Sequence, residues 1–308
     1  SINVVRNRLL RIVFRYLQML QLLDRIRVDW KVWARYREVN ILHEYDEQGR
    51  KLSLMYAGKS NTLTLCTVLI YSTDVLLNNG SKPARFSSPV DYYYFDAQKY
   101  YVYVYMHAVI TVSVGFIIVI ANDTMFIVYV QHGCGLFAAL GHRLERMGMN
   151  KGVSASDKKD VDYKNVAWCI QRHNDAIEYA ELIESTYSWC FFFLMGLNIL
   201  LISISELQVK FIDSQEIAKY VTCTIAAMLH LYVENYMPQS LMDHSISIRH
   251  NGKWYRLSLK AQRTLHLMMM RCNIACKLTA GKIAIMSVET FAVILRTSMS
   301  CLTVLRSM

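Results

Sequence analysis

Five long apolar blocks separated by charged segments dominate the chain, near residues 61–78, 100–130, 183–205, 217–237 and 279–305. Most reach the length of about 20 residues that a helix needs to cross the hydrocarbon core of a bilayer. The first block is short and contains Asp74, so it is the least regular of the five. Apolar residues fill these blocks instead of recurring at amphipathic spacing. The pattern therefore predicts an all-α fold, namely a polytopic helical membrane protein.

The segments beside these blocks predict further helix. Residues 1–60 contain no spanning block, but Leu9 to Leu23 form an amphipathic pattern that carries Arg11 and Arg15. The second block continues into "HGCGLFAALGHRLERM" with an apolar face, which predicts a helix that reaches about Met147. Since the chain starts at Ser1 without a methionine, we expect it to lack upstream helices.

Composition and charge support a membrane protein. Hydrophobic residues make up 54% of the 308 residues, charged residues only 19%, and there are three prolines. The net charge of +10 lies between the apolar blocks and accompanies no nucleic-acid-binding motif. We therefore expect no nucleic acid partner, and we interpret the positive charge as information about topology.

Lysine and arginine predict the orientation of the chain in the membrane. They are frequent in residues 25–59, 143–172 and 249–277, and scarce in residues 79–99 and 206–216. Because cytoplasmic segments carry an excess of positive residues, the amino terminus is expected in the cytoplasm and the carboxyl terminus outside the cell. Asn79-Gly80-Ser81 is a glycosylation sequon in a connection assigned to the outside, so Asn79 is the expected acceptor.

The last apolar block contains two ionisable residues, Glu289 and Arg296. A charged side chain at the bilayer centre costs about 2.5–3.5 kcal/mol on insertion scales. Glu289, Arg296 and Thr303 recur every seven residues, and Ser300 lies in the same helical stripe. Two interpretations remain open. Neighbouring helices of the same chain neutralise the charges, or the stripe lines a water-filled path where several copies of this helix meet.

Tyrosines crowd the outer end of the second block, at positions 92–94, 100, 101, 103 and 105. They are typical of an aromatic belt at the membrane interface. Met106, His107 and Thr111 follow one turn deeper, and such a mixture also suits a pocket for a small hydrophobic ligand.

Catalytic and metal-binding motifs do not emerge. Ala280-Gly281-Lys282 is not a phosphate loop, because Ile283 stands where a hydroxyl residue is required. We expect His132-Gly133-Cys134 and the Cys272/Cys276 pair to pack or to form local hydrogen bonds, because neither has partners at metal-ligand spacing. The sequence thus predicts no enzyme, no metal site and no cofactor.

Four stretches resemble the insect odorant receptor family. The carboxyl-terminal "KLTAGKIAIMSVETFAVILRTSMSCLTVL" is similar to the signature of that family, and "VDWKVWARYREVNILHEYDEQGRKLSLMY" resembles the approach to its third helix. "VQHGCGLFAALGHRLERM" resembles the cytoplasmic end of the fourth helix, and "IQRHNDAIEYAELIESTYSWCFF" the start of the fifth. The resemblance begins near residue 14 and implies the third to seventh of seven family helices.

The resemblance implies a tuning subunit of an odorant-gated, non-selective cation channel. Such a subunit assembles with the odorant co-receptor into a heterotetramer in the plasma membrane of a sensory neuron dendrite, surrounded by lipid, and binds a volatile or small hydrophobic odorant. The co-receptor itself is not expected, because its last helix opens differently. A related gustatory receptor or a polytopic transporter is the alternative.

The resemblance also assigns regions and residues. It implies a cytoplasmic segment at 1–60, ligand-binding and anchor helices at 61–237, a cytoplasmic connection with an anchor helix at 238–277, and a pore-lining helix at 278–308. Val304 matches the gate position, and Met308 falls at a second constriction. The pore residues are Glu289, Arg296, Ser300, Thr303, Val304 and Met308. By depth in the membrane, the expected odorant pocket contains Ile70, Thr73, Tyr101, Tyr105, His107 and Thr222.

Overall fold

The computed structural model describes the backbone of residues 2–77, 101–147, 155–211, 214–248, 255 and 257–307. Within these ranges it describes the side chains of residues 17–66, 103, 104, 106–147, 161–205, 217, 220–248, 255 and 257–300.

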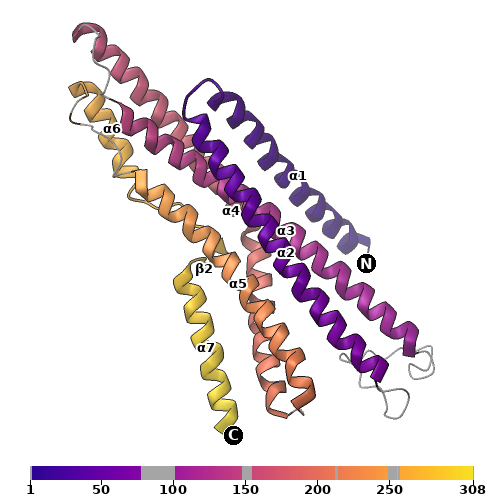
Figure 1. Ribbon diagram of the computed structural model, residues 1–308. Helices are drawn as coiled ribbons and strands as arrows, with labels where there is room; N and C mark the ends of the chain where they lie inside the picture. The colour runs from indigo at the N-terminus through magenta and orange to yellow at the C-terminus, as the bar shows by residue number, and fades with distance from the viewer. Residues whose placement is uncertain are drawn as a thin grey trace.

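Long helices arranged as an elongated bundle make up almost all of this part of the chain (Figure 1). The elements are α1 (Ile2–Trp33), α2 (Val39–Leu77), α3 (Tyr101–Arg146), α4 (Ala155–Phe211), α5 (Ser214–Ser247), α6 (Leu259–Arg271), β1 (Thr279–Ala280), β2 (Ala284–Ile285) and α7 (Val288–Ser307). The two strands pair antiparallel, with Thr279 opposite Ile285 and Ala280 opposite Ala284. The predicted all-α fold is confirmed.

The helices run back and forth between two ends of the molecule (Figure 1). The carboxyl ends of α2, α4 and α7 and the amino ends of α3 and α5 lie at one end. The turn from α1 to α2, the start of α4 and helix α6 lie at the other. The first end adjoins the lysine-poor connections and the second end the lysine-rich ones, as the topology derived from charge requires.

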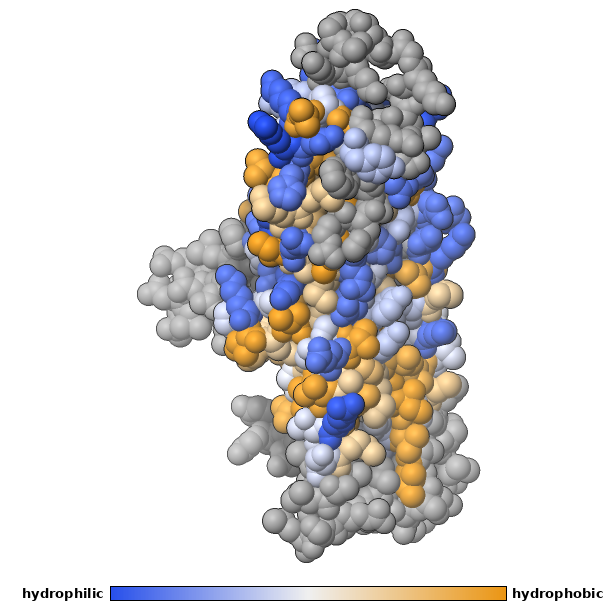
Figure 2. Space-filling view, turned by 90° about the vertical axis from the view of Figure 1, so that its left-hand side faces the viewer, coloured by the Kyte–Doolittle hydropathy of each residue, from blue (hydrophilic) through white to orange (hydrophobic). Residues whose placement is uncertain are grey.

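The core occupies the half of the bundle nearer to α6. On α3, side chains from Phe126 to Leu144 are mostly buried, whereas Ile117 and Ile118 nearer its start are 62% and 63% exposed. Neighbouring helical residues point about 100° apart, so this outer part of α3 is apolar and exposed around much of its circumference. Figure 2 shows hydrophobic side chains gathered in the lower part of the view and hydrophilic ones in the upper part. Such an exposed apolar surface fits lipid rather than water.

Two helical segments among the described residues are long and apolar enough to cross a membrane, Met106–Arg146 and Val161–Ser205, and each contains an 18-residue stretch with a mean hydropathy of 1.9. The second segment contains the third predicted block, and the first segment covers residues 106–130 of the second block. Helix α3 ends at Arg146, which confirms the predicted extension to about Met147, and α1 contains the predicted amphipathic helix.

The predicted start of the last helix is wrong. We expected helix from residue 279, but residues 279–285 form the two-stranded hairpin and α7 begins only at Val288. Gly281 and Lys282 form the turn with φ angles of 62° and 60°, a backbone conformation that a right-handed helix cannot contain. Ser287 then caps α7, because its Oγ accepts a hydrogen bond from the Thr290 N–H at 3.1 Å.

Candidate functional site

Helix α7 presents a polar stripe on the side that faces away from its own bundle. Glu289, Arg296 and Ser300 are exposed, whereas Ser298 is buried and Phe291 packs against the core. At about 100° per residue, Arg296 and Ser300 lie within about 20° of Glu289, and Ser298 lies about 180° away. Neither Glu289 nor Arg296 forms an ion pair with another described residue. Among the described side chains, therefore, no neighbouring helix neutralises these charges.

The hairpin fastens the start of α7 to α4. Thr279 donates its backbone N–H to Oε2 of Glu184 at 2.6 Å and its hydroxyl to Oε1 of the same carboxylate. The Gly281 N–H donates to the Ser188 carbonyl at 2.9 Å. A Cβ on Gly281 would lie 2.9 Å from Cδ2 of Phe192, so a side chain there would force the Phe192 ring to shift.

Helix α7 also contacts α5. The ring of Phe291 meets that of Tyr232 edge to face, with centroids 5.6 Å apart. The hydroxyl of Thr290 donates to the Ile285 carbonyl at 2.6 Å, which joins the first turn of α7 to β2. Helix α7 is thus attached to α4 through the hairpin and to α5 through Phe291.

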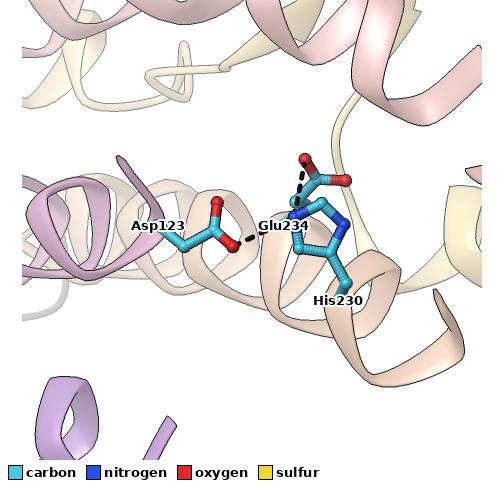
Figure 3. Close-up of side chains that lie close together, drawn as sticks. All are labelled: Asp123, His230 and Glu234. Atoms are coloured by element: carbon cyan, nitrogen blue, oxygen red, sulfur yellow. Dashed lines mark ion pairs between the residues drawn. The ribbon is translucent and has the colours of Figure 1, made fainter. Parts of the chain in front are cut away.

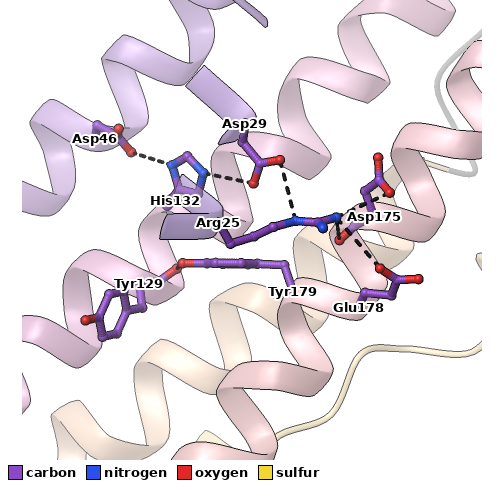
Figure 4. Close-up of polar contacts among 8 residues, drawn as sticks. All are labelled: Arg25, Asp29, Asp46, Tyr129, His132, Asp175, Glu178 and Tyr179. Carbon is purple, nitrogen blue, oxygen red and sulfur yellow. Dashed lines mark hydrogen bonds and ion pairs between the residues drawn. The ribbon is translucent and has the colours of Figure 1, made fainter. Parts of the chain in front are cut away.

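A buried ionic cluster joins α1, α2, α3 and α4 in the half of the bundle nearer to α6 (Figure 4). His132 of α3 is fully buried, and its ring lies between two carboxylates, with Nδ1 3.3 Å from Asp46 Oδ1 and Nε2 3.6 Å from Asp29 Oδ2. Arg25 continues the cluster from Asp29 to α4, where its Nη2 lies 3.3 Å from Asp175 Oδ1. This cluster fixes the relative positions of four helices.

In the same half of the molecule, two buried groups outside the spanning segments, Tyr45 and Cys272, have raised pKa values. Tyr45 of α2 lies 2.8 Å from Nε2 of His244 on α5, and burial raises the pKa of the tyrosine. Cys272 follows α6, and its Sγ lies 3.4 Å from Nε2 of His173. Burial raises the pKa of Cys272 to about 11, so this thiol is protonated at physiological pH.

A second polar cluster lies within the spanning part of the bundle (Figure 3). Nε2 of His230 on α5 lies 3.0 Å from Asp123 Oδ2 on α3 and 3.7 Å from Oε1 of Glu234, one helical turn further along α5. Tyr56 of α2 donates its hydroxyl to Asp123 Oδ2 at 2.5 Å, and the Asn198 amide of α4 lies 2.7 Å from His230 Nδ1. Polar residues from four helices thus meet in an apolar setting.

This second cluster was not among the sites predicted from the sequence. The signal was present, because Asp123 stands in the apolar run "FIIVIANDTMFIVYV" and Glu234 in "MLHLYVENYM". Asp123 and Glu234 are charged residues within apolar blocks, as Glu289 and Arg296 are, and a charge in such a block is costly unless it has a partner or a function.

Two residues of the expected odorant pocket have described side chains. His107 is exposed on the outer part of α3, and Thr222 is half-buried on α5. Ile70, Thr73, Tyr101 and Tyr105 have helical backbone, but their side chains lie outside the described residues. The pocket therefore stays a prediction.

The same holds for the outer mouth of the expected pore. The side chains of Thr303 and Val304 lie outside the described residues, as do Met308 and the glycosylation candidate Asn79 in their entirety. The gate and the sequon also stay predictions.

Comparison with known families identifies the chain. The model of the 7tm odorant receptor family matches residues 4–299. The chain belongs to the odorant receptor family. This family consists of receptors rather than enzymes, which confirms that expectation and decides for odorant receptors over the gustatory receptors and transporters left open by the sequence.

A curated relative of this odorant receptor supports the same family. It is 23% identical over 271 residues to Odorant receptor 13a of Drosophila melanogaster, a match that covers 80% of this chain and 64% of that protein. The chain thus spans about two thirds of the length of that relative.

Solved structures show the same fold. The olfactory receptor OR5 of Machilis hrabei in complex with eugenol superposes with a TM-score of 0.72 at 14% identity, over 95% of this chain and 79% of that one. A second structure of OR5 from Machilis hrabei gives a TM-score of 0.65 at 13% identity, over 94% of this chain and 78% of that one. The fold is therefore that of an insect olfactory receptor, a polytopic helical membrane protein.

Proposed function

We propose that this odorant receptor is the odorant-binding subunit of a non-selective cation channel that it forms with the odorant co-receptor. The observation that carries the proposal is the direction of the polar stripe on α7. Glu289, Arg296 and Ser300 are exposed on the face opposite to the packed one. One helix with one polar stripe cannot enclose a path for ions, so the stripe requires further subunits around a common axis.

The proposed arrangement follows the orientation derived from positive charge. Residues 1–60 and 238–277 lie on the cytoplasmic side, residues 61–237 supply the ligand-binding and anchor helices, and residues 278–308 line the pore with Thr303, Val304 and Met308 towards its outer mouth. The receptor lies in the plasma membrane of sensory neuron dendrites. The exposed apolar surface of outer α3 supports contact with lipid in this arrangement.

A volatile or small hydrophobic odorant is the proposed ligand. It occupies the outer half of the bundle, among Ile70, Thr73, Tyr101, Tyr105, His107 and Thr222. OR5 of Machilis hrabei has been solved in complex with eugenol, and the shared fold supports a small organic ligand here. Binding shifts the population of α4 and α5 positions, and the hairpin passes this shift to α7.

The proposal is tested by recording currents from cells that express the full-length receptor together with the co-receptor. A broad odorant panel should evoke cation current. Glu289→Gln should then lower the permeability of cations relative to anions, and Arg296→Gln should change the single-channel conductance, because both remove a charge from the water-filled path.

Two charge-neutralising variants outside the stripe serve as matched controls. Glu181→Gln on α4 and Arg263→Gln on α6 alter exposed residues and should leave permeation unchanged. Unchanged selectivity and conductance in both α7 variants would return Glu289 and Arg296 to a structural role. A surface-expressed complex that responds to no odorant would contradict the proposed function itself.

A further inference from the structure

Four helices bring polar side chains together around His230. Asp123 comes from α3, His230 and Glu234 from successive turns of α5, Tyr56 from α2 and Asn198 from α4. Ionisable residues are costly inside a membrane bundle, so three of them within reach of one another need a common reason. Neither odorant binding in the outer half nor the α7 stripe uses this cluster.

Glu234 shows that the side chains alone do not complete the cluster. Its residue is 2% exposed, and within the part of the chain that the structure describes neither carboxylate oxygen takes part in a hydrogen bond. The His230 ring is its ion-pair partner among the described residues, with Nε2 3.7 Å from Oε1. Oδ1 of Asp123 is likewise buried without a hydrogen-bond partner. A buried carboxylate in this state is neutralised either by a proton or by a further positive group.

The spacing of the donor atoms suits a metal ion. One ligand atom from each of Asp123, His230 and Glu234 lies within 4.8 Å of the other two. Zinc binds nitrogen and oxygen at about 2.0–2.2 Å, so tetrahedral ligand atoms lie about 3.4 Å apart. The His230 Nε2 distances of 3.0 Å to Asp123 and 3.7 Å to Glu234 lie on either side of that value. Binding of all three atoms to one ion would require the two carboxylates to draw closer together, because the three atoms now lie within 4.8 Å of one another.

Asn198 and Tyr56 lie beside the donor side chains in the positions that hydrogen-bond partners of metal ligands usually take. A ligating histidine usually donates its other ring N–H to an oxygen, and ligating carboxylates are themselves hydrogen-bonded. The Asn198 amide lies 2.7 Å from His230 Nδ1 and can turn its oxygen to that position, since an amide offers both a donor and an acceptor. Tyr56 already donates to Asp123 Oδ2.

Charge favours a divalent ion. Two carboxylates and a neutral imidazole carry two negative charges, which a dication neutralises where the surroundings are apolar. The His230 side chain is 13% exposed, which gives an ion a path to the donors, whereas the side chains of Asp123 and Glu234 are 4% and 2% exposed.

We propose that Asp123, His230 and Glu234 bind a divalent transition metal ion, with Zn²⁺ the best fit to one nitrogen and two carboxylate ligands. The ion holds α3 against α5, and Tyr56 and Asn198 orient its ligands from α2 and α4. Because α5 also contacts α7 through Tyr232 and Phe291, the metal sets how freely α5 can move relative to α3 when an odorant binds.

The test uses the full-length receptor purified in detergent with its co-receptor, stripped with a chelator and titrated with Co²⁺. Four-coordinate Co²⁺ gives strong visible absorption bands, which report directly on ligand geometry. The receptor should bind one Co²⁺ per copy with these bands, Zn²⁺ should displace it, and Zn²⁺ should raise the melting temperature of the chelated protein.

The variants separate this site from surface histidines. Glu234→Gln and His230→Gln should abolish the bands and the Zn²⁺-dependent rise in melting temperature. Asn198→Ala, which affects only the orientation of His230, should weaken Co²⁺ binding about 10-fold. His142→Gln is the matched control, because His142 and Glu145 form an exposed pair on α3 with Nδ1 3.4 Å from Oε2, and it should bind as tightly as the wild type.

Two results would contradict a metal site at His230. A wild-type receptor that shows neither Co²⁺ bands nor a Zn²⁺-dependent shift has no such site, and a proton then neutralises Glu234. Full Co²⁺ binding by Glu234→Gln places the metal elsewhere. Both results concern metal binding only, so odorant-evoked current in the same preparation still decides the proposed function independently.

Discussion

The carboxylate of Glu184 on α4 accepts two hydrogen bonds from Thr279 in the hairpin that precedes α7, one from the backbone N–H and one from the hydroxyl. Both donors come from one residue, so the pair fixes the position and the direction of the hairpin together. The helix that carries the charged stripe is therefore attached to α4 at its base.

Glu184→Gln and Thr279→Val should loosen this attachment. Hydrogen bonds to a charged group contribute about 1.5–3 kcal/mol, so each variant should lower the melting temperature of the receptor in detergent and shift the odorant dose–response curve. Glu181→Gln, an exposed residue one turn earlier on α4, should change neither. Equal behaviour of Glu184→Gln and Glu181→Gln would show that the attachment does not matter.

Gly281→Ala should destabilise the hairpin for two reasons. Its φ of 62° is unfavourable for a residue with a Cβ, and that Cβ would meet Phe192 at 2.9 Å. We expect a loss of about 1–3 kcal/mol, measured as a lower melting temperature. Adding Phe192→Ala should remove the clash but not the backbone strain, so the double variant should lose less than the sum of the single ones.

Gly196→Ala provides the matched control for that glycine. Gly196 lies within α4, and a Cβ there would meet nothing within 4 Å. Alanine in a helix interior is favoured over glycine by about 0.5–1 kcal/mol, so this variant should melt at the same or a slightly higher temperature. A loss as large as that of Gly281→Ala would contradict the geometric explanation.

His132→Ala should cost far more than removal of a surface ion pair. Removing one partner from a buried ionic cluster leaves an uncompensated charge and costs about 3–5 kcal/mol, and here Asp29 would lose its contact with the ring. Poor recovery of folded receptor in size-exclusion chromatography is the expected result. Lys51→Ala, which breaks an exposed pair with Glu47 at 3.0 Å, should leave recovery unchanged.

Cys272 should respond to pH differently in the folded and the unfolded receptor. Only the thiolate reacts with alkylating reagents, and burial raises the pKa of this thiol from 9.0 to about 11. Its alkylation rate, followed by mass spectrometry, should still be rising at pH 10 in the folded protein and should level off above pH 9 in denaturant.

The same pKa shift has a consequence for stability. Because the folded state holds the proton more tightly than the unfolded state, the contribution of Cys272 is complete below pH 9 and is lost as pH rises towards about 11. Levelling off at pH 9 in both states would show that the thiol is not buried.

Sequence patterns predicted the helical fold well, because spanning helices satisfy their backbone hydrogen bonds internally and leave long apolar runs. The start of α7 was predicted too early, because "KLTAGKIAIM" is apolar enough to look like the beginning of a spanning helix. Hydropathy does not record a positive φ, and only Gly281 and the cap residue Ser287 marked the break.

The site was predictable in part. The spacing of Glu289 and Arg296 placed them on one stripe, since helical geometry depends on local spacing alone. The meeting of Asp123 with His230 joins helices more than a hundred residues apart in the chain, and no local pattern reports it. The same limit applies to His132 and its partner Asp29 on α1.

The meeting of four helices at His230 also has a consequence for biosynthesis. The ribosome makes α3, with Asp123, well before α5, with His230, so the carboxyl group must wait inside the membrane without its partner. Integration of the later helix then captures the earlier ones in a single step. Substitutions at His230 should consequently lower the share of receptor that leaves the endoplasmic reticulum, even where the remainder folds.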